Sequence, residues 1–192
     1  MVGHVPLEDV ILVRIQVPQL VNFISIRYNV YMSLNELEKI KSEFSRLSLH
    51  PTYLEHEAVT TSEEAAKTRG LKLKQGIKAL LFTNGKNDWT IVNMPADQKA
   101  DLKKICLKLG WSRTSIRMAT KEKVEEMTGC EIGSVPPFGH KTLIPILVDR
   151  LVFDNKESAF TIGLRTNSVK IKTKEMKDLF EDIGAQEGDF VE

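Results

Sequence analysis

The chain has 192 residues, of which 42% are hydrophobic and 28% are charged, and its formal net charge is +1 at pH 7. The length suits one globular domain with an extension. The balanced charge excludes a chain that is basic throughout, although a local basic patch is still allowed. The two cysteines, Cys106 and Cys130, form neither a CxxC pair nor a zinc-ligand spacing, which is typical of a reducing compartment.

Residues 1–32 are predicted to form an N-terminal extension, followed by one domain over 33–192. The stretch 10–30 is apolar, but two arginines, four amide side chains and a proline interrupt it, which is too polar for a bilayer span. Glu8 and Asp9 argue against a secretory or mitochondrial signal. We therefore expect a cytoplasmic protein without a membrane partner.

The first predicted helix begins at Ser33, because Glu36 lies at the capping-box spacing from it. Apolar residues at helical spacing follow, namely Leu34, Leu37, Ile40, Phe44 and Leu47. The alternation over 52–59 predicts a short strand. A second capping box, Thr61 with Glu64, predicts a helix that ends near Gly70.

The middle of the chain reads as a β-hairpin over 76–95, in which two apolar runs flank Asn84 and Gly85. An amphipathic helix is predicted over 97–110, with Asp97 near its start and Gly110 at its end. A short strand over 116–119 and a helix from Thr120 follow.

The C-terminal part predicts a buried strand over 142–149, kinked or bulged at Pro145. Two further strands are predicted over 158–163 and 168–172, and a helix over 173–184. Because strands and helices interleave and several strands pair as hairpins, we expect an α/β or α+β fold with a mixed sheet.

The segment 128–140, TGCEIGSVPPFGH, is nearly neutral and contains a G-x-x-x-P arrangement from Gly133 to Pro137. Its prolines fix the backbone and its glycines leave amides uncovered, so it can present N–H groups to an ester carbonyl or a phosphate. The alternative is a stiff crossover between a helix and a strand, which the pattern alone favours.

Lys78 is the one charged residue in the apolar run GIKALLF. Period-2 geometry places it on the same strand face as Leu80 and Phe82. A half-buried ammonium there would need an anionic partner and would have a shifted pKa. The alternative is a solvated lysine at a sheet edge, which discourages aggregation.

Polar residues near other strand ends have several interpretations. Asp149 follows an apolar strand and is a catalytic acid, a lysine partner or, most simply, a turn cap. Gly163 and Asn167 are ordinary turn residues, although Asn167 is also suited to bind a ligand. His56 lacks an HExxH context and is a structural or site-rim histidine, whereas His140 is interpreted as a rim residue. Cys130 has no thiolate-stabilising neighbour in the sequence.

Five segments occur in an order and spacing that resembles the YbaK/prolyl-tRNA synthetase-associated editing domain family, the ProX- and INS-like aminoacyl-tRNA deacylases. They are EHEAVTTSEEAAKTRG, GIKALLF, LKLGWSRTSIRMATKEKVEEMTGCEIGSVPPFG, LIPILVD and FTIG. The resemblance covers roughly 34–184 and includes Lys78 as the family's strand lysine and Gly133 to Pro137 as its G-x-x-x-P loop. It reverses the simpler interpretations of Lys78 and of the loop.

The resemblance implies a mixed, barrel-like β-sheet core flanked by helices. It also implies hydrolysis of the ester of a mischarged tRNA, with tRNA(Pro) carrying alanine or cysteine as the expected substrate and serine or threonine as further candidates. The implied catalytic residues are Lys78, Gly133 and Asp149. The implied substrate-binding residues are His56, Ser134, Val135, Pro136, Pro137, Phe138, Gly139, His140, Gly163 and Asn167.

The implied partners are the 3′ CCA end of an aminoacyl-tRNA and an aminoacyl-tRNA synthetase; no metal and no cofactor is expected. The near-neutral charge predicts weak affinity for tRNA by itself, because phosphate neutralisation drives such binding. The alternative function is a non-catalytic module of the same fold that binds tRNA or a synthetase. The extension 1–32 is not explained by the resemblance.

Overall fold

A computed structural model describes residues 35–192. The predicted extension and the Ser33 cap lie outside the described residues. The described part starts with a helix over 35–46, whose apolar stripe is buried as expected: Leu37, Ile40 and Phe44 are at most 6% exposed. No helix among residues 35–192 is long and apolar enough to cross a membrane.

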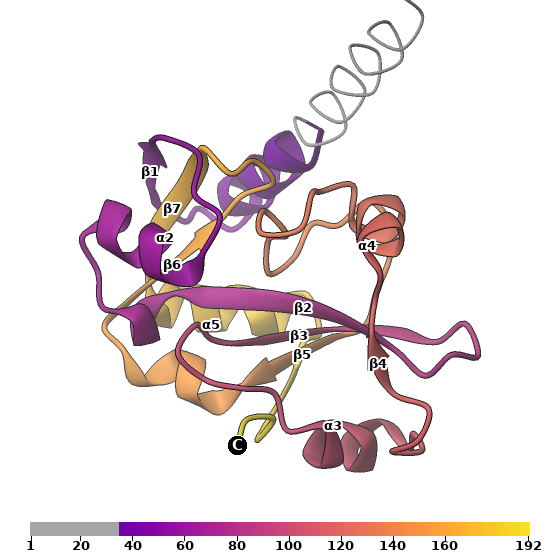
Figure 1. Ribbon diagram of the computed structural model, residues 1–192. Coiled ribbons are helices and arrows are strands. Elements are labelled where there is room, and N and C mark those ends of the chain that lie inside the picture. The colour runs from indigo at the N-terminus through magenta and orange to yellow at the C-terminus, as the bar shows by residue number, and fades with distance from the viewer. Residues whose placement is uncertain (1–34) are drawn as a thin grey trace, which may run out of the picture.

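The larger sheet has five strands in the order β4-β2-β3-β5-β8 (Figure 1). They are β2 (Ile77–Thr83), β3 (Trp89–Pro95), β4 (Arg117–Met118), β5 (Ile146–Asp149) and β8 (Gln186–Gly188). Strands β2 and β3 form the predicted antiparallel hairpin, with Thr83 opposite Trp89 next to the turn. Strand β5 adds parallel to β3, and β8 adds parallel to β5, so the sheet is mixed.

The smaller sheet has three antiparallel strands in the order β1-β7-β6. They are β1 (Thr52–Glu55), β6 (Glu157–Thr161) and β7 (Asn167–Lys172). An isolated bridge between Gly76 and Ala159 joins the two sheets. The mixed α/β architecture is therefore confirmed, but as two open sheets and not as one closed barrel within 35–192.

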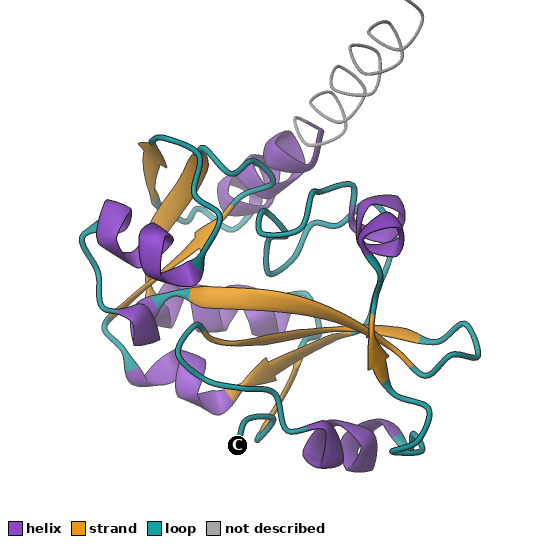
Figure 2. Ribbon diagram, viewed as in Figure 1, coloured by secondary structure: helices purple, strands orange, loops and turns teal. Residues whose placement is uncertain are grey.

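Helices lie on both sides of this framework (Figure 2). They are α2 (Ser62–Arg69), α3 (Leu102–Leu109), α4 (Lys121–Thr128) and α5 (Thr173–Asp182), with short 3-10 helices η1 (Leu73–Gln75) and η2 (Arg150–Asp154). Helix α2 carries the predicted reciprocal cap between Thr61 and Glu64 and ends at Gly70, which adopts a φ of 66°. The capping box therefore correctly located this helix.

Three buried clusters hold the elements together. The first joins the helix 35–46, the small sheet and α5, and it contains Phe44, Phe138 and Phe160. The second packs α3 against the large sheet around Phe82 and Ile105. The third joins α4 to β2 and β3. The large sheet thus has apolar contacts on both faces, which fixes β2 rigidly between α3 and α4.

Several predicted boundaries are wrong, and the strand predicted over 52–59 already ends at Glu55. Helix α3 begins at Leu102, because the Asp101 carboxylate caps it by accepting from the backbone N–H groups of Lys103 at 2.8 Å and Lys104 at 3.2 Å. The strand predicted over 142–149 begins only at Ile146. Pro145 lacks an N–H and contributes only its carbonyl, which accepts from the N–H of Ile91 at 3.0 Å.

Candidate active site

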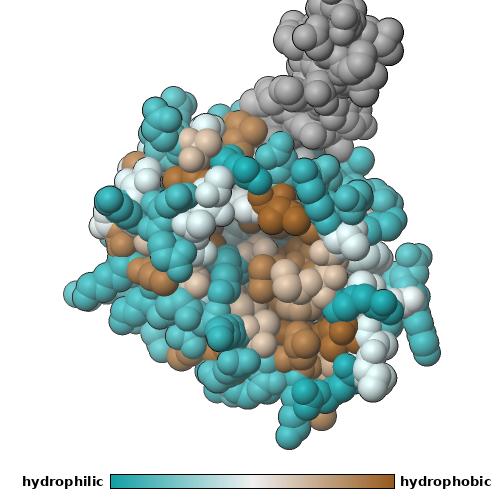
Figure 3. Space-filling model, in the orientation of Figure 1, coloured by the Kyte–Doolittle hydropathy of each residue, from teal (hydrophilic) through white to brown (hydrophobic). Residues whose placement is uncertain are grey.

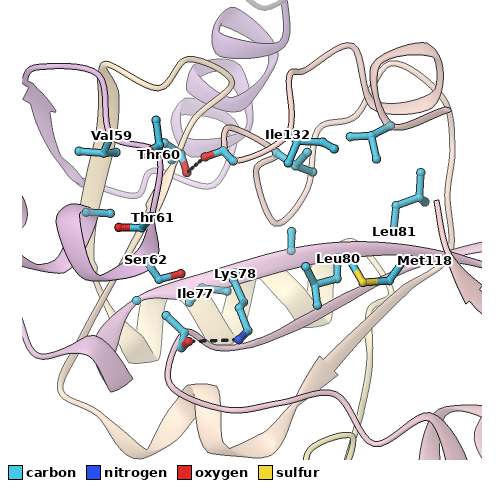
Figure 4. A pocket seen from close by; sticks show the side chains of 18 of the residues that line it. Val59, Thr60, Thr61, Ser62, Ile77, Lys78, Leu80, Leu81, Met118 and Ile132 are labelled. Carbon is cyan, nitrogen blue, oxygen red and sulfur yellow. Dashed lines mark hydrogen bonds between the residues drawn. The ribbon is translucent and has the colours of Figure 1, made fainter. Parts of the chain in front are cut away.

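A cavity of about 230 Å³ opens beside β2, between the start of α2 and the loop that follows α4 (Figure 4). One side is polar, with Thr60, Thr61, Ser62 and Thr161 in the lining, and Arg69 and Lys78 supply two cations. The other side is apolar and includes Leu80, Leu81, Met118, Ile132 and Val135. Figure 3 shows the corresponding hollow as a hydrophobic area bordered by hydrophilic side chains. Such a mixed lining suits a small organic ligand with few polar groups.

Three residues of the proline loop, Ile132, Gly133 and Val135, line this cavity. Gly133 has a φ of 87°, which side chains of L-residues rarely adopt, although an added Cβ would meet no atom closer than 3.8 Å. Its carbonyl accepts from the Thr161 hydroxyl at 3.5 Å. Its N–H has no hydrogen-bond partner among residues 35–192. Glycine is therefore required here for its backbone conformation, which leaves one amide donor free at the cavity.

The rest of the loop lies behind the cavity and anchors it. Phe138 is 1% exposed and packs edge-on against Phe44 and Phe160, with ring centroids 5.7 and 5.9 Å apart. The buried Asn93 side chain of β3 donates to the Pro137 carbonyl at 3.0 Å. The proline loop is thus fixed to the core at Phe138 and to the sheet through Asn93.

His140 supports the same loop, since its Nε2 donates to the Pro136 carbonyl at 2.8 Å. Burial lowers the pKa of His140 to about 4. Ser134 is also buried: its hydroxyl donates to the Glu131 carbonyl at 2.8 Å, and its own carbonyl accepts from the N–H of Gly163 at 3.1 Å. Gly139 sits against Ile40 of the first helix. These residues hold the loop and do not line the cavity.

Lys78 lies half-buried on β2 and lines the cavity. Its Nζ donates to the carbonyl of Ala96 at 3.1 Å (Figure 4). It also donates to the carbonyl of Gln98. Burial lowers the pKa of Lys78, and the charges of Asp97 and Glu63 oppose that shift. The predicted anionic partner is therefore not in direct contact. Two backbone carbonyls orient the ammonium instead.

Arg69 is a cavity residue that the sequence analysis did not single out. It is 7% exposed, and its Nε donates to the Ser168 hydroxyl at 3.0 Å. Burial lowers the pKa of Arg69 to about 10, and no carboxylate forms an ion pair with it in the described part of the chain. In sequence Arg69 resembles an ordinary cation in the last turn of a helix. Only the approach of β7 shows that it is buried.

Three other predicted site residues lie outside the cavity lining. Asp149 is 1% exposed, and its carboxylate accepts from the N–H of Leu151 at 2.9 Å and of Phe190 at 2.6 Å. His56 bonds to Ser168, the same hydroxyl that Arg69 contacts, at 2.8 Å. Asn167 begins β7, and its side-chain oxygen accepts from Thr166 at 2.8 Å. The structure thus brings Lys78, Gly133 and Val135 together and places the other predicted residues around them.

The described part of the cavity lining contains no carboxylate, histidine or cysteine. Cys130 lies near the loop, but burial raises its pKa to about 12, so the thiol stays protonated at neutral pH. The chemistry available at the cavity consists of two cations, hydroxyl groups and a free amide, which is suited to polarising a carbonyl and stabilising a developing negative charge.

Comparison with known proteins agrees with this arrangement. A model of the aminoacyl-tRNA editing domain family matches residues 56–179. A multifunctional Ser/Thr-tRNA deacylase, ProXp-y of Escherichia coli K12, is 38% identical over 122 residues, which are 62% of this chain and 72% of the relative. A proline–tRNA ligase of Trichlorobacter lovleyi is 29% identical over 92 residues, 48% of this chain and 16% of the ligase.

The fold also matches a solved structure. The crystal structure of a proposed trans-editing enzyme for prolyl-tRNA synthetase superposes with a TM-score of 0.70 at 28% sequence identity, and the match covers 82% of this chain and 97% of that one. The matched family segment spans both Lys78 and the proline loop, which are among the features that carry the resemblance in sequence. The chain therefore belongs to the aminoacyl-tRNA editing domain family and is an aminoacyl-tRNA hydrolase.

Proposed function

We propose that the chain clears tRNA mischarged with serine or threonine, and that the ester is cleaved in the cavity between Lys78 and Gly133. The observation that carries this proposal is that a tethered ammonium and a free backbone amide line one cavity of about 230 Å³. The sequence-based expectation favoured alanine or cysteine on tRNA(Pro). Two features of the cavity and of its relatives support the hydroxylated amino acids instead.

The first feature is the polar side of the cavity. Hydroxyl groups of Thr60, Thr61, Ser62 and Thr161 lie in the lining, and the Arg69 guanidinium is buried there without an ion-pair partner in residues 35–192. A substrate hydroxyl accepts and donates hydrogen bonds in such surroundings, whereas a methyl group does neither and a thiol does so only weakly. The second feature is the 38% identity with a protein named as a Ser/Thr-tRNA deacylase.

The volume of the cavity supports selection of a small amino acid. The cavity is smaller than the roughly 300–1,000 Å³ of pockets for drug-sized ligands. Ile132 and Val135 narrow it from the loop side, and Leu80 narrows it from β2. Phe138 and Asn93 fix the loop to the core and to the sheet. The apolar wall of the cavity therefore cannot move outward easily to admit a larger side chain.

The proposed mechanism uses the ester's own reactivity. The Gly133 N–H donates to the carbonyl oxygen as negative charge develops on it, and the Lys78 ammonium stabilises that charge or a nearby phosphate oxygen. The attacking water is oriented with help from the free ribose hydroxyl of the terminal adenosine. On this proposal Asp149 has no catalytic role, because backbone N–H groups already occupy both of its oxygens. No metal or cofactor takes part in any step.

We also propose a natural tRNA and a protein partner. The likeness to part of a proline–tRNA ligase supports tRNA(Pro) as the carrier and a synthetase as a partner. A panel of Ser-, Thr-, Ala- and Cys-tRNA, each prepared on tRNA(Pro) and on its cognate tRNA, separates the amino acid from the carrier.

The decisive experiment compares wild type with Lys78→Met, which keeps the length and apolar stem of the side chain but removes its charge. We expect kcat/KM for Ser-tRNA to fall about a hundredfold, the size of effect expected for one electrostatic group at a developing oxyanion. Lys74→Met, a change at an exposed lysine of η1, is the control and leaves activity unchanged. Equal activity of wild type and Lys78→Met would refute the mechanism. Inactivity of wild type on all four esters, with synthetase binding retained, would favour the non-catalytic alternative.

A further inference from the structure

The positive charge of the chain is concentrated in one region, although its total is near zero. Residues 99–123 contain eight lysines and arginines but only two acidic residues, Asp101 and Glu122. Two of the cations, Lys121 and Lys123, pair with glutamates of α4. Lys99 precedes α3, and the other five belong to α3, to the turn after it and to β4; Lys86 of the β2–β3 turn lies close to Arg117. We call the following residues the basic surface: Lys86, Lys103, Lys104, Lys108, Arg113 and Arg117.

The contacts place members of the basic surface side by side at two points. The Arg117 guanidinium lies directly over the β2–β3 turn, since a Cβ added at Gly85 would be 2.5 Å from the Nη2 atom of Arg117. Lys86 is the next residue of that turn. At the other end, the backbone N–H of Lys104 is the main cause that lowers the pKa of Asp101, and the charges of Lys104 and Arg113 add to the effect, so Arg113 lies near the start of α3. Figure 1 shows α3, β4 and the β2–β3 turn along the same side of the large sheet.

The cations of the basic surface are exposed and form no ion pairs with other described residues. All six side chains belong to exposed residues, and none forms an ion pair with another residue in the range 35–192. Among their side-chain nitrogens, Lys104 Nζ donates to the backbone carbonyl of Val191 at 2.6 Å. Like charges held together in this way repel one another, and the phosphates of an external polyanion relieve this repulsion. Binding is also favoured because the polyanion releases its condensed counterions.

The basic surface is continuous with the cavity. Arg117 and Met118 are neighbours in β4, where they pair with Thr83 and Phe82 of β2. Met118 is 58% exposed and lines the cavity. Met118 therefore lies where the cavity lining meets β4, next to Arg117 of the basic surface (Figure 4). A polyanion on this surface would have one end at the mouth of the cavity.

We propose that the phosphate backbone of the tRNA acceptor arm lies on this basic surface while the 3′-terminal adenosine enters the cavity past Met118. This inference rests on the proposed function for the identity of the RNA. It differs from the sequence-based expectation that the near-neutral chain binds tRNA only weakly, because on this proposal the cations without ion pairs act together. Phosphate contacts of this kind position an RNA and supply affinity without reading its sequence.

The test is a triple variant, Lys103→Ala/Lys108→Ala/Arg113→Ala. These side chains were chosen because they make no hydrogen bond or ion pair within 35–192, so their removal should not disturb the fold. The matched control, Lys156→Ala/Lys170→Ala/Lys174→Ala, removes three cations without ion pairs from the region of β6, β7 and α5. Binding of uncharged tRNA is measured by fluorescence anisotropy at several salt concentrations, together with deacylation kinetics.

We expect the slope of log affinity against log salt to fall in magnitude by about 2–3 in the triple variant, at roughly 0.7–0.9 per phosphate contact, and affinity near 0.1 M salt to fall at least tenfold. The control stays within about twofold of wild type. In deacylation the loss should appear in KM and not in kcat. An aminoacylated CCA trinucleotide, which is too short to reach the basic surface, should be hydrolysed equally by all three proteins.

Equal salt slopes in the triple variant and the control would overturn the proposal, as would an equal loss on the trinucleotide. Loss of synthetase binding with unchanged tRNA binding would also overturn it and assign the surface to a protein partner. If the chain deacylates neither substrate, the proposed function fails. The anisotropy data on uncharged tRNA still decide whether the basic surface binds RNA.

Discussion

Replacement of Gly133 by alanine separates the role of this residue in backbone geometry from its role in packing. Its φ is 87°, yet an added Cβ would find no atom within 3.8 Å. The cost therefore arises almost wholly from backbone conformation, about 1–2 kcal/mol for an L-residue held in the left-handed region. For a chain of this size that corresponds to a decrease of about 2–8 °C in Tm.

In Gly133→Ala the backbone at this position should relax away from the left-handed φ. This change should turn the free N–H of residue 133 away from the cavity. Loss of one oxyanion donor costs about 10²–10³ in kcat in other hydrolases. Because alanine keeps the N–H and only redirects it, we expect a decrease in kcat of at least about tenfold on Ser-tRNA, with a smaller change in KM. Steady-state deacylation and thermal unfolding, measured on the same preparations, give both quantities.

Gly184→Ala is the matched control. Gly184 follows α5, has a φ of 72°, and has no atom within 4 Å of an added Cβ. Its substitution should destabilise the fold by a similar 1–2 kcal/mol and leave kcat unchanged. If both variants retain wild-type kcat, the Gly133 amide is not part of the chemistry. If both lose kcat equally, the loss reflects general destabilisation, and the reasoning about the loop is refuted.

Two further predictions concern residues behind the site. Asp149→Ala leaves the N–H groups of Leu151 and Phe190 without their acceptor, so urea unfolding should show a loss of about 2–4 kcal/mol, while kcat of the folded protein stays unchanged; a selective loss of kcat would restore a catalytic role for Asp149. Burial lowers the pKa of His140 to about 4, so its contribution to stability is complete above pH 6.5 and is lost as the pH falls toward 4, by about 2–3 kcal/mol in total. Stability measured by urea unfolding from pH 7 to pH 4.5 should therefore decline less steeply in His140→Gln than in wild type, and parallel curves would contradict the assignment.

Local sequence signals correctly predicted the elements that depend on neighbours in the chain. The Thr61–Glu64 box gave α2, and the glycines at 110 and 129 adopt the left-handed φ that ends α3 and α4. The β2–β3 hairpin forms around Asn84 and Gly85 as expected. Each of these signals is a contact within about four residues, so the sequence contains all the information that the element needs.

The features that sequence reasoning missed depend on contacts between distant segments. Strand β8 has only three residues and exists because β5 offers it a parallel edge. Asp97 and Asp101 are equivalent helix caps in sequence. Asp101 is the residue in the cap because its N–H donates to the carbonyl of Phe190 near the C-terminus at 2.8 Å. The buried position of Arg69 likewise depends on Ser168, which is 99 residues away.

Some residues of the loop 128–140 anchor it and others line the cavity, and this separation helps to explain why the loop is almost uncharged. Its prolines, Phe138 and His140 are used for anchoring, and only Ile132, Gly133 and Val135 line the cavity. A lysine or arginine on this loop would attract the tRNA phosphates toward the amide that the proposed mechanism reserves for the ester carbonyl. With the unpaired cations on α3 and β4, beyond Met118, the polyanion is attracted to a surface next to the cavity, and the neutral loop remains free to select the acyl group. Introducing Val135→Lys into the loop should therefore raise affinity for uncharged tRNA while lowering kcat, and a rise in both, measured by anisotropy and by deacylation, would refute this account of the loop's neutrality.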